Sequence, residues 1–101
     1  MLLILCTAPA ASAESIARAL VDERVAACVN LVPGVVSIYR WKGEVTRDDE
    51  VLLVIKTRDD KLGALREAIR CVHPYEVPEI VVLSPSEVSD AYARWVDGET
   101  A

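Results

Sequence analysis

The chain contains 101 residues, of which 52% are hydrophobic and 27% are charged, and its formal net charge at pH 7 is −5. This length and composition predict one domain, residues 1–101, with a hydrophobic core, and exclude a disordered or low-complexity protein. The acidity argues against nucleic-acid binding, which depends on Lys and Arg side chains that neutralise phosphates, and makes a cation the more natural ligand.

The N-terminal residues predict a strand and not a targeting segment. The apolar run at residues 2–6 lacks a preceding basic residue and is shorter than the roughly 7–15 residues of a signal-peptide core. No apolar run approaches the roughly 18 residues that span a membrane. The cysteines Cys6, Cys28 and Cys71 form no Cys-x-x-Cys motif, which favours reduced thiols. We therefore expect a cytoplasmic protein with no membrane partner.

The first elements in the chain are a predicted strand and a predicted helix. The uninterrupted apolar run at residues 2–6 is typical of a strand buried on both faces. Ser12 can cap a helix in which apolar residues recur at helical spacing, and we expect this helix to end near Arg24.

A long β-hairpin is predicted next, with strands at residues 28–41 and 44–57 and a tight turn at Gly43. Pro33-Gly34 indicates an edge strand or a bulge. Strands of about 14 residues reach nearly 45 Å, farther than a domain with a radius of gyration near 13 Å can cover. The hairpin should therefore protrude, and because exposed strand edges are templates for pairing, we expect a homo-oligomer.

A second helix is predicted after the hairpin. Thr57-x-x-Asp60 resembles a capping box at its start, and the helical periodicity continues to Val72, until Pro74 stops it. Residues 73–79, His-Pro-Tyr-Glu-Val-Pro-Glu, form a segment that we call the strap. Each strap proline disfavours the α conformation in the residue before it, so we expect a stiff, extended segment.

The chain ends with a predicted strand at residues 80–83 and a short helix that opens at Pro85 and Ser86. The order β-α-β-β-α-β-α contains the ferredoxin-like βαββαβ arrangement plus a C-terminal helix, an α+β fold. In that arrangement the first and third strands are central, and these contain the two continuous apolar runs, at residues 2–6 and 51–55.

Three side chains are candidate metal ligands: Cys6, Cys28 and His73. Thiolate and imidazole groups together suit copper or zinc. The alternative stays open that the cysteines are small core residues and that His73 caps a helix C-terminus. Cys71, two residues before the histidine, has no assigned role. There is no catalytic triad pattern, glycine-rich phosphate loop or His-Glu metal motif, so we expect no enzymatic activity.

A series of spaced motifs runs through the whole chain. They are Leu5-Cys6-Thr7-Ala8-Pro9, Ala26-Ala27-Cys28-Val29-Asn30, Pro33-Gly34-Val35, Tyr39-x-Trp41-x-Gly43, Ile55-Lys56-Thr57, the strap and Tyr92-x-x-Trp95. Together they resemble the CutA divalent-cation-tolerance family. One position departs from the family pattern: Ala10 stands where an acidic residue is usual.

The resemblance implies a ferredoxin-like homotrimer, similar to PII signalling proteins, with pockets between subunits and a link to tolerance of divalent metals, copper above all. It also implies the polar residues of such a pocket: Lys56, Tyr75, Glu76 and Glu79. A structural ion pair between Lys56 and Glu79 is the alternative. The aromatic side chains of Tyr39, Trp41 and Trp95 are expected at interfaces or in the core.

Two main functional hypotheses follow. The first is a cytoplasmic homotrimer that binds divalent ions, copper or another metal, and contributes to metal tolerance. The second is a PII-like sensor or scaffold that binds a small molecule or a partner protein at the cleft between subunits. A third is a trimeric anchor that binds no ligand.

Overall fold

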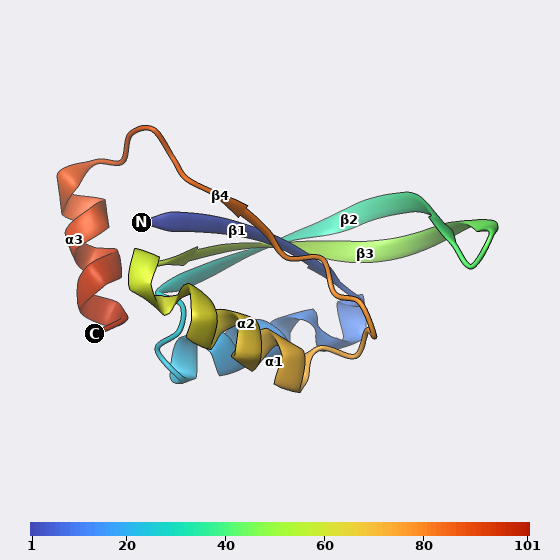
Figure 1. Ribbon diagram of the computed structural model, residues 1–101, viewed down its shortest axis with the longest axis horizontal. Helices are drawn as coiled ribbons and strands as arrows, with labels where there is room; N and C mark the ends of the chain where they lie inside the picture. The colour runs from blue at the N-terminus through green and yellow to red at the C-terminus, as the bar shows by residue number, and fades with distance from the viewer.

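The computed structural model describes all residues of the chain, 1–101, as one four-stranded sheet with helices (Figure 1). The strands and helices are β1 (Leu2–Ala8), α1 (Ala10–Asp22), β2 (Cys28–Trp41), β3 (Glu44–Thr57), the 3₁₀ turn η1 (Asp59–Lys61), α2 (Leu62–Val72), β4 (Val81–Leu83) and α3 (Asp90–Glu99). None of the helices combines the length and hydropathy that a membrane-spanning helix requires.

The sheet has the strand order β2-β3-β1-β4, and all neighbouring strands are antiparallel. This order confirms the ferredoxin-like arrangement, with the apolar strands β1 and β3 at the centre. Ile4 lies opposite Ile55 and Cys6 lies opposite Leu53, so both pairs project from the same face of the sheet. All four side chains are fully buried in the core.

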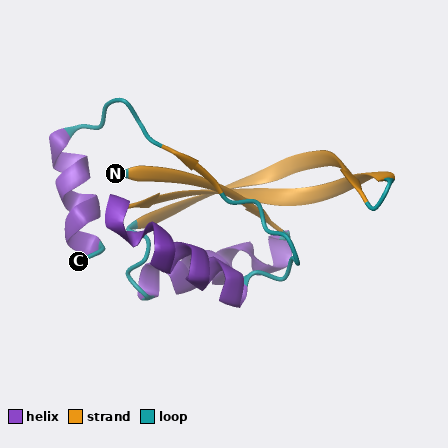
Figure 2. Ribbon diagram, in the orientation of Figure 1, coloured by secondary structure: helices purple, strands orange, loops and turns teal.

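Helices α1 and α2 cover that face (Figure 2). The buried side chains of α1 recur at helical spacing and include Ile16 and Leu20, and α2 adds Leu65 and Ile69. These four residues belong to the same cluster of buried side chains as Ile4 and the other core residues of β1 and β3. Helix α3 lies apart from α1 and α2, at the end of the sheet where β1 begins (Figure 1).

The opposite face of the sheet, which we call the open face, is not covered by α1 or α2. Strand alternation places Leu3 and Leu5 of β1 on it, and the register adds Leu52 of β3 and Val81 of β4. Val81 is exposed, and the other three are half-buried. One side of the sheet therefore presents apolar side chains that no helix of the chain buries as a core.

The β2–β3 hairpin extends far beyond the helices (Figure 1), and the longest dimension of the molecule is 44 Å. Lys42 and Gly43 at its tip have φ angles of 49° and 82°, as a two-residue type I′ turn requires. The register shifts between Val32 and Val35, where Gly34 has a φ of 77°. The protruding hairpin, its turn and its bulge all agree with the sequence predictions.

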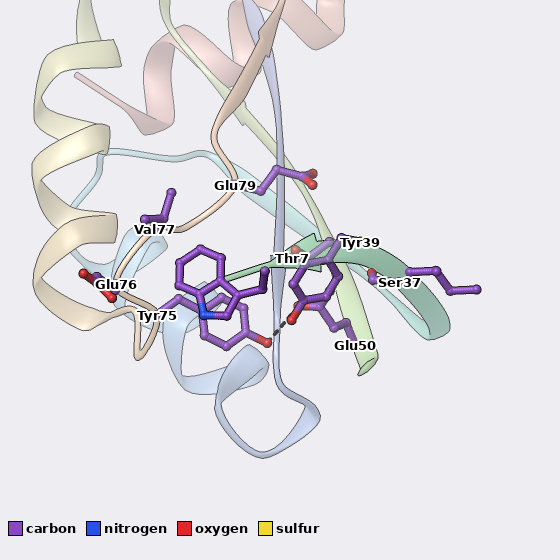
Figure 3. A pocket seen from close by; sticks show the side chains of 10 residues that line it. Thr7, Ser37, Tyr39, Glu50, Tyr75, Glu76, Val77 and Glu79 are labelled. Carbon is purple, nitrogen blue, oxygen red and sulfur yellow. Dashed lines mark hydrogen bonds between the residues drawn. The ribbon is translucent and has the colours of Figure 1, made fainter. Parts of the chain in front are cut away.

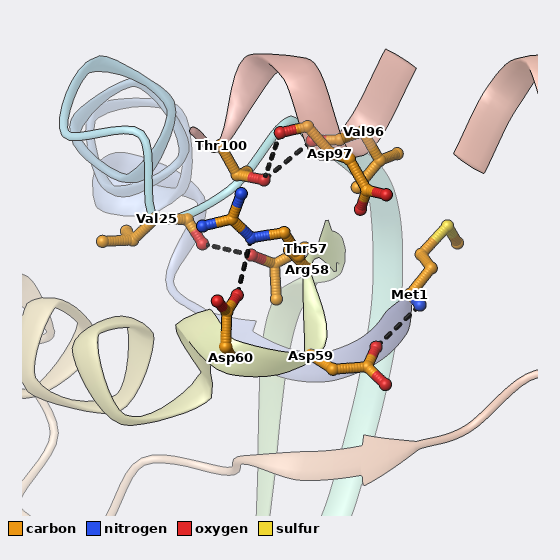
Figure 4. A network of polar contacts seen from close by, with 9 residues as sticks. All are labelled: Met1, Val25, Thr57, Arg58, Asp59, Asp60, Val96, Asp97 and Thr100. Atoms are coloured by element: carbon orange, nitrogen blue, oxygen red, sulfur yellow. Dashed lines mark hydrogen bonds and ion pairs between the residues drawn. The ribbon is translucent and has the colours of Figure 1, made fainter. Parts of the chain in front are cut away.

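Two of the predicted helix caps are wrong. Helix α1 begins two residues earlier than Ser12, after Pro9, and Ser12 makes no capping bond. Thr57 does not cap α2, because its side chain turns into the core and Oγ1 donates to the Val25 carbonyl at 2.7 Å (Figure 4). A 3₁₀ turn separates this threonine from the helix. The last helix begins at Asp90, later than predicted.

Candidate functional site

The strap is attached to the end of β1 through His73. The backbone N–H of Tyr75 donates to His73 Nδ1 at 3.1 Å, so the ring carries its hydrogen on Nε2 and donates to the Thr7 carbonyl at 2.8 Å. Only 8% of His73 is exposed. Its ring centroid lies 4.8 Å from that of Tyr75. The histidine therefore fixes where the strap starts and where Tyr75 points.

This geometry contradicts the prediction that His73 is a metal ligand. Both ring nitrogens already make hydrogen bonds, and a metal would need the lone pair of a neutral imidazole nitrogen. Binding at Nδ1 would detach the backbone of Tyr75, and binding at Nε2 would detach the strap from Thr7.

The cysteines do not assemble into a site either. Cys6 is fully buried on the helix-covered face, and burial, reinforced by the Glu79 and Glu50 carboxylates, raises the pKa of its thiol to about 12. Cys28 lies opposite Lys56, on the open face, and Cys71 is exposed on α2. A thiolate is the form that binds metal. No three His, Cys, Asp or Glu side chains of the chain are grouped to hold a metal ion, so the predicted set is wrong for one chain.

A hollow of about 460 Å³ lies between the strap, the end of β1 and the hairpin (Figure 3). Its lining residues are Thr7, Ser37, Ile38, Tyr39, Trp41, Glu50, Tyr75, Glu76, Val77 and Glu79. Three of them are glutamates and none is a lysine, arginine or histidine. We call this site the acidic hollow. Three of the four residues predicted for an inter-subunit pocket, those of the strap, line it; the contribution of a second subunit stays a prediction.

Glu50 is the member of the hollow that sequence reasoning missed. It is the last charged residue before the apolar half of β3 and lies on the open face, two residues before Leu52. Only 6% of Glu50 is exposed, and its Oε2 accepts a hydrogen bond of 2.8 Å from the Tyr75 hydroxyl (Figure 3). The signal in the sequence was strand alternation, which puts this carboxylate beside apolar neighbours.

The carboxylate of Glu50 has no cationic partner in the chain. The salt bridges of the structure involve other residues, at the N-terminus, on the helices and on the hairpin. A buried charge is normally paired with an opposite charge or bound to a metal, because removing it from water is costly. The Glu50 carboxylate is therefore the group of the hollow best placed to attract a cation.

Two tyrosines act as hydrogen-bond donors at the hollow. Tyr39 donates to Asp48, and this hydrogen bond raises the pKa of its phenol. Burial, together with the hydrogen bond to Glu50, raises the pKa of the Tyr75 phenol well above its usual value. Both phenols therefore stay protonated at neutral pH and donate to carboxylates. Trp41 completes the aromatic side of the site.

Lys56, the fourth predicted pocket residue, lies elsewhere. Its ammonium group interacts with Asn30 Oδ1 and lies 3.8 Å from Cys28 Sγ. Thr7, which lines the hollow, pairs with Leu52 of β3. Lys56 lies four residues farther along β3, about 13 Å from Leu52. Within one chain Lys56 therefore neither lines the acidic hollow nor pairs with Glu79; its place in a pocket between subunits stays a prediction.

Trp95 is also remote from the acidic hollow. It lines a second, smaller hollow beside α1 and stacks on Tyr92, with ring centroids 5.6 Å apart. Of the three predicted interface aromatics, only the two on the hairpin, Tyr39 and Trp41, lie at the acidic hollow.

Comparison with known proteins decides the family. The family model described as CutA1 divalent ion tolerance protein matches residues 2–99, nearly the whole chain. The chain belongs to the CutA1 family. The resemblance found in the sequence motifs is therefore confirmed.

Individual proteins that are similar to this chain also carry the CutA name. The divalent-cation tolerance protein CutA of Thermus thermophilus is 49% identical over 98 residues, which are 96% of this chain and 95% of that protein. A CutA homolog of Xenopus laevis is 51% identical over 84 residues, 83% of this chain and 56% of the longer animal protein. The solved structure of the PII-like protein CutA from Nostoc sp. has a TM-score of 0.95 and 43% identity, covering 100% of this chain and 98% of that one.

Proposed function

We propose that this CutA1 protein is a homotrimer that binds divalent cations in the acidic hollow and contributes to metal-ion tolerance. The observation that carries the proposal is the charge of the hollow: three carboxylates and no cationic side chain. The name of the Thermus relative, a divalent-cation tolerance protein, supports the same function. Glu50, Glu76 and Glu79 are the candidate oxygen ligands, although the three are not grouped around one point within one chain.

The charge also separates the two main hypotheses. A PII-like sensor of an anionic small molecule would need positive groups in its cleft, since the carboxylates repel a phosphate or carboxylate ligand. The acidic hollow offers none. The metal hypothesis is therefore the better supported, and the PII-like sensor remains only for a ligand that is cationic.

Oxygen ligands specify which oxidation state of copper we propose. Carboxylates suit hard divalent ions, and among first-row metals an oxygen site binds Cu²⁺ most tightly. We therefore keep copper as the preferred ion, as Cu²⁺ and not Cu⁺, because the soft thiolates are not part of the site. Within one chain no three of these side chains are grouped to hold an ion, so the proposal requires ligands from water or from a second subunit.

Assembly of several copies, which the proposed trimer requires, has its own structural support. The open face presents exposed apolar side chains at Val32, Val81 and Leu83. The outer strand β2 is a long edge whose backbone groups can pair with another chain. Large exposed apolar patches mark interaction surfaces, and closed symmetric homo-oligomers are the common solution.

We also propose a cytoplasmic location and no catalytic activity. His73 supports the second point, because the only imidazole of the chain uses both nitrogens in structural hydrogen bonds and has none left to act as a base.

Titration calorimetry with Cu²⁺ and Zn²⁺ tests the proposal. We expect Glu79→Gln to weaken binding, while the double variant Cys6→Ala, Cys28→Ala retains it. Glu87→Gln is the matched control, because that glutamate is exposed and outside the hollow. Undiminished binding in Glu79→Gln combined with loss in the cysteine variant would reverse the assignment of ligands. Light scattering after size exclusion should give three chains per particle, and a monomer would refute the assembly.

A further inference from the structure

We propose that the acidic hollow also recognises an organic cation, a protonated amine or guanidinium carried on an apolar body, with Glu50 as its charged anchor and Tyr39, Trp41 and Tyr75 as its apolar walls. This inference concerns the same site as the proposed metal function and rests on that site being open to cations. It adds a class of ligand that a metal site alone does not explain.

The first reason is the Glu50 carboxylate. Only 6% of the Glu50 residue is exposed to solvent. It receives one hydrogen bond, from Tyr75, on Oε2. Its Oε1 makes no hydrogen bond within the chain. Every buried side-chain oxygen of the structure has a hydrogen-bond partner, so Oε1 is not itself buried. Because Glu50 lines the hollow, Oε1 opens onto it. A positively charged hydrogen-bond donor would give Oε1 a hydrogen bond and would also neutralise the charge of the carboxylate.

The second reason is the chemistry of the other walls. Five of the ten lining residues are hydrophobic, and three of these are aromatic. A hydrated metal ion gains nothing from aromatic or aliphatic walls, because it needs oxygen or nitrogen ligands. An alkylammonium or guanidinium ion gains from both, since aromatic faces attract cations and the walls bury its apolar body.

The third reason is size. The volume of about 460 Å³ falls in the range of sites for small organic molecules, roughly 300–1,000 Å³, and far exceeds what one ion occupies. Trp41 also attracts an ammonium group in this chain, because Lys42 Nζ lies 5.9 Å from the centre of its ring. Lys42 itself is not one of the lining residues.

Three probes of similar shape isolate the charge: 2-phenylethylammonium, neutral 2-phenylethanol and the anion phenylacetate. Binding is measured by calorimetry and by protein NMR in metal-free buffer with a chelator. We expect the ammonium to bind and the anion not to bind. Glu50→Gln should weaken ammonium binding roughly tenfold or more, as expected for loss of a charged hydrogen bond, and leave 2-phenylethanol unaffected. Glu87→Gln, on the exposed loop after β4, should change nothing.

The aromatic walls provide the test that separates this inference from the metal proposal. Trp41→Leu should weaken the ammonium probe severalfold and leave Cu²⁺ binding unchanged, because the indole is not a metal ligand. Circular dichroism and light scattering confirm that each variant keeps its fold and assembly.

Several outcomes would overturn the inference. Equal affinity for the ammonium and the alcohol would remove the role of charge. No binding of the ammonium by the assembled wild-type protein would overturn the inference outright. If Cu²⁺ binds in that case, only this inference fails; if the ammonium binds and Cu²⁺ does not, only the metal proposal fails.

Discussion

Replacing His73 tests whether the histidine anchors the strap or binds a metal. His73→Ala removes the hydrogen bonds to Thr7 and from Tyr75, each worth about 0.5–1.5 kcal/mol net. It also removes the ring contact with Tyr75, at a centroid separation of 4.8 Å, worth about 0.5–1.5 kcal/mol. We therefore expect the free energy of unfolding to fall by about 1.5–4.5 kcal/mol, with Cu²⁺ affinity nearly unchanged if the trimer persists.

Two conservative variants divide this loss between the ring nitrogens. His73→Asn can accept from the Tyr75 backbone but loses the donor to Thr7, and His73→Gln can keep that donor and lose the acceptor. Each should lie between the wild type and His73→Ala in guanidinium unfolding at one fixed protein concentration. A His73→Ala protein of unchanged stability that no longer binds Cu²⁺ would refute the anchoring role and restore the histidine as a ligand.

Four further predictions follow from single residues. Tyr75→Phe leaves the Glu50 carboxylate without its hydrogen bond and should cost about 1–3 kcal/mol of unfolding free energy; an unchanged denaturation midpoint would show that solvent replaces the hydroxyl. The raised pKa of Cys6 predicts that alkylating reagents at pH 8 label exposed Cys71 and not Cys6 in the native protein. Since the unfolded thiol ionises near 9.0 and the folded one near 12, stability should fall as pH rises between these values, less so in Cys6→Ala; identical pH profiles would contradict the assignment. Lys42→Asn should raise stability by about 0.5 kcal/mol, because asparagine accepts the positive φ of 49° at the hairpin turn better than lysine; a lower melting temperature would count against this.

The fold was predictable because its signals are local. The apolar runs of β1 and β3, the glycine at the hairpin turn and the proline after α2 each act on neighbouring backbone. The caps were mispredicted for a tertiary reason. Thr57 has the spacing of a capping residue, but burial in the core gives its hydroxyl a partner in Val25 instead.

The site was only partly predictable, because the residues that line it come from segments that are far apart in the sequence. The strap residues Tyr75, Glu76 and Glu79 could be found from the dense polar group after α2. Glu50 could not be recognised as their partner without the sheet register that places it at the strap. Residue type alone also misplaced His73, whose two hydrogen bonds depend on Thr7 and on the turn of the strap.

Electron paramagnetic resonance of the Cu²⁺-loaded protein tests most directly whether the acidic hollow is the metal site. Oxygen ligation by its carboxylates predicts a spectrum without imidazole nitrogen couplings, and one that changes in Glu79→Gln but not in His73→Gln. Imidazole couplings that vanish in His73→Gln would contradict a carboxylate site.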